Sequence, residues 1–137
     1  MQMRKKNISL CLSALSFGFL LYVLFRPNTY VGSLLNGWAY IDIIRQMSSF
    51  FASDLCKFYL PDFLWAFSLG CGLIAIYTPK TTGVVVCALC PFLCGLTWEL
   101  LQHFALLSGT GDIVDIIMYF LASALCLIIN LRESKKE

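Results

Sequence analysis

The strongest candidates for chemistry in this sequence are Glu99, Gln102 and His103, which interrupt an otherwise apolar stretch. Their i, i+3, i+4 spacing places all three side chains on one face of a helix. Asp112 and Asp115 follow after a short turn, again three residues apart. Because the connection is short, the two polar faces can meet. Carboxylates gathered in this way can bind a cation or a hydroxyl-rich group, or exchange protons with a substrate.

Two further residues join this group by position. Asp62 follows Pro61 in the first turn of another apolar stretch, and Tyr119 lies one turn after Asp115. An ionisable group inside a membrane span costs about 3 kcal/mol or more unless it faces protein or water, which makes Glu99 the strongest single functional candidate. The predicted ligand-binding residues are Glu99, Gln102, Asp112, Asp115, Asp62, His103 and Tyr119.

Each of these residues also has a purely structural interpretation. Asp112, or Thr110 before it, can cap a helix N-terminus, where a carboxylate complements the helix dipole. Glu99 and Asp115 can join helices through hydrogen bonds. A metal site of Glu99, His103 and one aspartate suits zinc or manganese chemically, but there is only one histidine. We therefore predict no metal or other cofactor and assign no catalytic residue.

The elements that position these residues are predicted to be transmembrane helices. Of the 137 residues, 59% are hydrophobic and 13% are charged, about half the charged fraction of a soluble domain. A helix needs roughly 20 mostly apolar residues to cross the hydrocarbon core. Four such stretches cover residues 8–25, 60–77, 81–104 and 112–131. The sequence thus predicts a single all-α membrane domain over residues 1–137.

Basic residues precede the first apolar stretch, as they do in a signal peptide. No small-residue cleavage site follows the stretch, so we interpret it as a retained first helix. The outer loop 26–59 is predicted to contain a short interfacial helix, because its apolar residues recur at helical spacing while its polar residues face elsewhere. The apolar set is Ile41, Ile44, Met47 and Phe51, and the polar set is Asp42, Arg45 and Ser49.

The distribution of basic residues predicts the orientation of the four spans. With the N-terminus inside, seven basic residues are cytoplasmic and three are external, which agrees with the positive-inside rule. The internal set is Arg4, Lys5, Lys6, Lys80, Arg132, Lys135 and Lys136, and the external set is Arg26, Arg45 and Lys57. Both termini are then cytoplasmic, and the candidate site faces outward.

Several other function classes lack a signal in the sequence. The net charge of +2 and the absence of a Lys/Arg stripe argue against nucleic acid as a partner. Cys87, Cys90 and Cys94 align on one helix face, but their flanks are apolar, so we interpret them as small packing residues rather than redox groups. No Gly-rich phosphate loop or Ser/His/Asp arrangement is present.

The segment 95–124 closely resembles the signature of the VanZ-like family of small bacterial membrane proteins. That signature reads Glu-x-x-Gln, a short turn and Asp-x-x-Asp, and in this sequence it falls on Glu99, Gln102, Asp112 and Asp115. The four-helix layout of the family matches the predicted spans. The resemblance is specific over about 30 residues and weak elsewhere.

Two positions depart from the family pattern. The family commonly has an asparagine four residues after the last aspartate and a glycine three residues further on, whereas this chain has Tyr119 and Ala122. The family is named for a protein associated with resistance to the glycopeptide teicoplanin. The resemblance implies a bacterial cytoplasmic membrane and an outward-facing site near lipid headgroups or cell-wall precursors.

Three functional hypotheses follow from the sequence. In the first, the carboxylates bind a cationic or hydroxyl-rich headgroup, so the partners are membrane lipids or a cell-wall or glycopeptide-related ligand. In the second, a carboxylate pair supplies the acid and the base of an enzyme that acts at the membrane surface. In the third, the polar groups only hold three helices together. The oligomeric state is not predicted.

Overall fold

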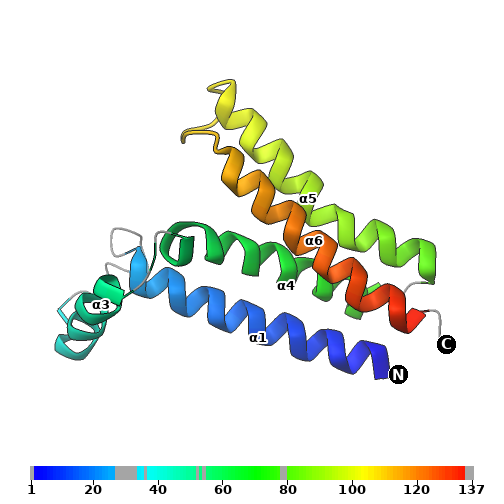
Figure 1. Cartoon of the computed structure of the whole chain (residues 1–137), viewed down its shortest axis with the longest axis horizontal. Coiled ribbons are helices and arrows are strands. Elements are labelled where there is room, and N and C mark those ends of the chain that lie inside the picture. Colours follow the sequence, from blue (N-terminus) through cyan, green and yellow to red (C-terminus); the bar gives the residue numbers. More distant parts are fainter. Residues whose placement is uncertain are drawn as a thin grey trace.

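The computed structural model of the chain describes residues 2–26, 34–35, 37–51, 53, 55–77 and 80–134. This part of the chain is built from helices and contains no strand (Figure 1). The helices are α1 (Gln2–Phe25), α3 (Ala39–Phe51), α4 (Leu60–Tyr77), α5 (Thr81–His103) and α6 (Ile113–Ser134), with a π-helical turn η1 (Leu55–Tyr59) leading into α4. The all-α prediction is confirmed.

Four of these helices are long and apolar enough to span a membrane, as the sequence predicted: Gln2–Phe25, Leu55–Tyr77, Thr81–His103 and Ile113–Arg132. The chain therefore has the architecture of a multi-pass membrane protein. The main difference from prediction is that α1 begins six residues before residue 8. The predicted span begins at residue 8 because the charged residues Arg4, Lys5 and Lys6 lie outside the apolar stretch. Arginine and lysine have good helix propensity, so the helix itself continues through them.

Helix α4 is the central helix of the bundle. It packs against α1, α5 and α6, while α5 and α6 lie side by side as an antiparallel pair (Figure 1). Small residues allow this close packing, since a Cβ atom built on Gly70 would lie 3.0 Å from Sγ of Cys126. Cys71 and Cys126 are both fully buried. At these two positions cysteine packs as a small apolar residue.

Helix α3 confirms the predicted helix between the first and second spans. Arg45 donates hydrogen bonds from Nε and Nη2 to the carbonyl oxygen of Val23, at 3.2 and 3.0 Å. These bonds tie α3 to the end of α1. Ile43, Ile44 and Met47 are each at least half exposed. Their exposure is consistent with the predicted interfacial helix, whose place at the membrane surface stays a prediction.

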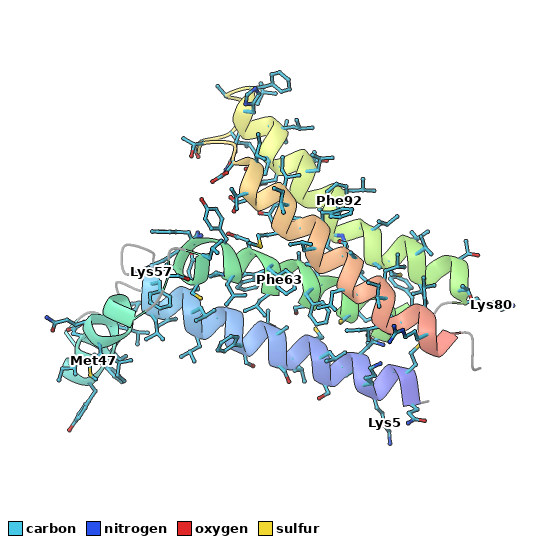
Figure 2. All side chains as sticks on the ribbon, in the orientation of Figure 1. Lys5, Met47, Lys57, Phe63, Lys80 and Phe92 are labelled. Carbon is cyan, nitrogen blue, oxygen red and sulfur yellow. The ribbon has the colours of Figure 1, made fainter. Side chains whose placement is uncertain are left out.

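The start of α1 and the end of α6 lie at the same end of the bundle (Figure 1). Lys5 and Lys80 lie at that end as well, whereas Lys57 lies at the opposite end (Figure 2). An even number of crossings returns the chain to the side on which it started. The cytoplasmic location of that side stays a prediction of the positive-inside count.

A pair of buried asparagines joins α1 to α6, which the sequence did not reveal. Asn7 and Asn130 are both fully buried. Nδ2 of Asn7 donates a hydrogen bond of 2.6 Å to Oδ1 of Asn130, and Nδ2 of Asn130 donates to the carbonyl oxygen of Cys126 at 2.8 Å. In an apolar medium such amides hold two helices together because no water competes for them.

Replacing Asn130 alone with leucine is expected to lower the free energy of unfolding by about 1 kcal/mol, because Asn7 then loses its partner across the helices. Equilibrium unfolding in mixed micelles measures the effect. In the double variant with leucine at positions 7 and 130, no amide is left unpaired, so most of the lost stability should return. A single variant as stable as wild type would contradict this account of the pair.

Candidate functional site

Glu99 lies at the junction between α5 and α6. Its side chain is only 3% exposed, and Oε2 accepts a hydrogen bond of 3.0 Å from the backbone N–H of Asp112. A Cβ atom at position 111 would lie 2.8 Å from the carbonyl oxygen of Glu99, so glycine is needed for this approach. The carboxylate therefore fixes the chain that returns from α5 into α6.

Asp112 caps helix α6, as the structural interpretation predicted. Oδ1 of Asp112 accepts a 2.9 Å hydrogen bond from the backbone N–H of Val114, near the helix N-terminus. Its other oxygen, Oδ2, accepts a bond of 3.2 Å from the hydroxyl of Tyr59 in η1. Tyr59 was not singled out in the sequence, where it reads as one of several aromatic residues next to a span.

Asp62, Glu99, Asp112 and Asp115 form what we call the acidic cluster. Asp62 interacts electrostatically with Glu99, and Asp115 interacts with all three other carboxylates. Nη2 of Arg26, at the end of α1, lies 3.5 Å from Oδ2 of Asp62. The structure thus brings together carboxylates from α4, from α5 and from the start of α6, as predicted from the antiparallel spans.

Asp115 differs from the other members of the cluster in its hydrogen bonding. Its Oδ1 atom is buried and accepts no hydrogen bond from any residue in the described part of the chain. Its electrostatic neighbours include the other three carboxylates, which repel it. A buried acceptor without a donor destabilises a fold by about 1–3 kcal/mol.

Tyr119 lies beside the acidic cluster, as predicted. It interacts electrostatically with Asp62, Glu99 and Asp115. The ring packs directly over Gly95, where a Cβ atom would overlap three carbon atoms of the ring. The absence of a side chain at position 95 therefore allows the Tyr119 ring to pack closely against α5.

Gln102 and His103 do not join the acidic cluster, although they are close to Glu99 in sequence. Nε2 of Gln102 donates a hydrogen bond of 3.3 Å to the carbonyl oxygen of Ser108 and so braces the α5–α6 turn. His103 is exposed, and its ring contacts Phe104 edge-on with a centroid distance of 5.5 Å. His103 is the last residue of α5, so it lies where the helix ends.

The donors for the metal hypothesis do not converge. Among the residues with described positions, no three His, Cys, Asp or Glu side chains lie close enough together to hold a metal ion.

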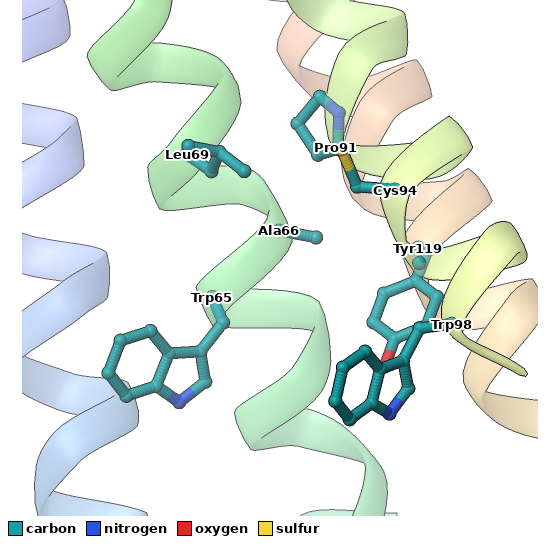
Figure 3. Close-up of a pocket in the computed structure, with 8 residues that line it drawn as sticks. Trp65, Ala66, Leu69, Pro91, Cys94, Trp98 and Tyr119 are labelled. Carbon is teal, nitrogen blue, oxygen red and sulfur yellow. The ribbon is translucent and has the colours of Figure 1, made fainter. Parts of the chain in front are cut away.

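A pocket of about 420 Å³ opens between α4 and the α5–α6 pair (Figure 3). We call it the lateral pocket because several of its lining residues are exposed on the outer surface of the bundle. Its lining includes Trp65, Ala66 and Leu69 from α4, Pro91, Cys94 and Trp98 from α5, and Tyr119 from α6. Tyr119 thus lines the pocket and interacts electrostatically with the acidic cluster.

No protein-family model, curated protein or solved structure matches this chain. The resemblance to the VanZ-like family within residues 95–124 therefore stays a prediction from the sequence.

Proposed function

We propose that this protein binds the cationic or hydroxyl-rich headgroup of a membrane amphiphile at the acidic cluster. The observation that carries the proposal is Oδ1 of Asp115, which is buried and accepts no hydrogen bond from the described residues. A ligand with ammonium or hydroxyl groups supplies the missing donor and offsets the repulsion from the neighbouring carboxylates.

The balance of charge supports a cationic ligand. Four carboxylates interact in the acidic cluster, and Arg26 contacts the cluster through Asp62. In a medium of low dielectric constant, such an excess of negative charge attracts a cation strongly. An ammonium group placed among the carboxylates would lower their mutual repulsion.

A purely structural role explains some of the residues but not all of them. It accounts for Glu99, which holds the turn, and for Asp112, which caps α6. It also accounts for Asp62, which pairs with Arg26 at the end of α1. It gives no reason for Asp115, whose buried Oδ1 atom has no described donor, to face the other carboxylates. Ionisable groups inside a span are costly, and Asp115 therefore supports a binding function.

We further propose in which membrane and in which leaflet this site lies. The positive-inside count supports cytoplasmic termini, which would place the acidic cluster at the outer leaflet. The VanZ-like motif supports a bacterial cytoplasmic membrane, a ligand related to cell-wall precursors and a link to glycopeptide resistance. These assignments rest on the sequence pattern and extend the proposal beyond the geometry.

Native mass spectrometry of the protein released from mild detergent tests the proposed function. Wild type is expected to carry an amphiphile that the Glu99→Gln, Asp115→Asn double variant loses, since a neutral amide lacks the negative charge that strengthens a hydrogen bond from an ammonium group. Asp42→Asn is the matched control, because Asp42 is an exposed carboxylate on α3 that pairs with Arg45. Identical spectra for wild type and an equally folded double variant would refute the proposal.

A further inference from the structure

Tyr119 links the lateral pocket to the acidic cluster. Tyr119 lines the pocket and interacts electrostatically with Asp62, Glu99 and Asp115. Apart from Tyr119, the pocket is lined by apolar, aromatic and thiol side chains. An apolar cavity therefore lies next to a residue that interacts with the carboxylates, and an amphiphilic molecule requires this combination of apolar and charged surroundings.

The order of residues along α4 and α5 places the acidic cluster and the lateral pocket one after the other along the bundle. Trp65 lies three residues after Asp62 on α4, and Trp98 is adjacent to Glu99 on α5. The two tryptophans lie at one end of the pocket, and Leu69 and Pro91 lie at the other end, further from the carboxylates (Figure 3). Tryptophan prefers the level at which hydrocarbon gives way to polar groups.

The location of the pocket limits what can fill it. Trp65, Leu69 and Trp98 are each more than 40% exposed and belong to helices that are long and apolar enough to span a membrane. Inside a bilayer, the molecules next to such a surface are lipid chains rather than water. The volume of about 420 Å³ also lies within the range of ordinary ligand pockets.

Building on the proposed function, we infer that the lateral pocket holds the hydrocarbon chain of the same amphiphile whose headgroup binds the acidic cluster. The ligand is then one molecule with a cationic head and an apolar tail, and it lies along Tyr119. The carboxylates select the charge of the head, and the wall formed by Ala66 and Cys94 holds the tail. A free water-soluble cation binds the acidic cluster but leaves the lateral pocket empty.

Three probes separate the two halves of the site. Hexadecylamine has both the charge and the chain, hexadecanol has the chain without the charge, and butylamine has the charge with a short chain. Native mass spectrometry of the protein in mild detergent measures their binding. Wild type is expected to bind hexadecylamine at least about tenfold more tightly than either of the other probes, because each of them lacks one set of contacts.

Three variants assign the contacts. Cys94→Trp places a large ring in the pocket from an exposed position, where folding should be preserved. It is expected to weaken hexadecylamine binding at least about tenfold and to leave butylamine binding unchanged. Val86→Trp is the matched control, since Val86 is an exposed residue of α5 outside the pocket lining. Asp115→Asn is expected to weaken both amines, and thermal unfolding confirms that each variant is folded.

The outcomes distinguish the inference from the function on which it rests. If Cys94→Trp binds hexadecylamine as well as wild type while Asp115→Asn does not, the pocket assignment is overturned and the headgroup site stands. If Asp115→Asn binds both amines normally, the proposed function is overturned. A dimer that carries no amphiphile would instead assign the pocket to a second copy of the chain and would overturn the inference.

Discussion

Replacing Gly95 with valine is expected to lower the free energy of unfolding by about 3 kcal/mol. Even a single Cβ atom at this position would overlap the Tyr119 ring. The larger side chain forces α5 and α6 apart and moves Tyr119 away from Glu99. Equilibrium unfolding in mixed micelles measures the change, and loss of amphiphile binding should accompany it.

Two further variants separate this steric effect from the change in helix propensity. Gly72→Ala gains about 1 kcal/mol of helix propensity, more than a change from glycine to valine gains, and its new Cβ atom meets only the Cys11 thiol at 3.3 Å. Removing the ring with Tyr119→Ala should abolish the destabilising effect of Gly95→Val, apart from the packing lost with the ring. If Gly95→Val destabilises equally in both backgrounds, the predicted clash is not the cause.

Replacing Asp115 with leucine is expected to raise the free energy of unfolding by about 1–2 kcal/mol and to abolish binding at the acidic cluster. Leucine removes a buried oxygen that has no described donor and ends the repulsion from three carboxylates. Residues that serve binding rather than folding often show this opposition between stability and function. Chemical unfolding and native mass spectrometry on the same preparation measure both quantities.

Ser123→Ala is a useful comparison on the same helix. Its hydroxyl is also buried without a hydrogen-bond partner among the described residues, but Ser123 is uncharged and lies about two turns further along α6. It is expected to leave amphiphile binding unchanged. If Asp115→Leu destabilised the protein in proportion to the loss of binding, the carboxylate would have a structural role and the binding hypothesis would fail.

The position of the carboxylates at one level of the bundle could be predicted, because it follows from the lengths of the apolar stretches and from helical periodicity. Asp62, Glu99 and Asp115 lie near the ends of apolar stretches, and antiparallel helices bring those ends to one level. Glu99 and Asp115 are also joined through a short turn. Helical periodicity and span length are local properties, so the sequence carries this information directly.

Other features depend on the path of the chain between spans and could not be predicted. Tyr59 reaches Asp112 only because a π-helical turn precedes α4, and no sequence pattern indicated that turn. Asn7 and Asn130 meet across 123 positions of sequence. His103 has the correct spacing from Glu99, yet it lies at the end of α5, where spacing does not determine its contacts.

If the exposed lateral pocket faces lipid as proposed, its ligand enters sideways and never leaves the bilayer. The mole fraction of the ligand in the leaflet, and not the volume of surrounding buffer, then sets the occupied fraction of the pocket. Dilution of vesicles would leave the bound fraction unchanged, whereas addition of inert phospholipid would reduce it. The protein would then report on the composition of the leaflet around Trp65 and Trp98.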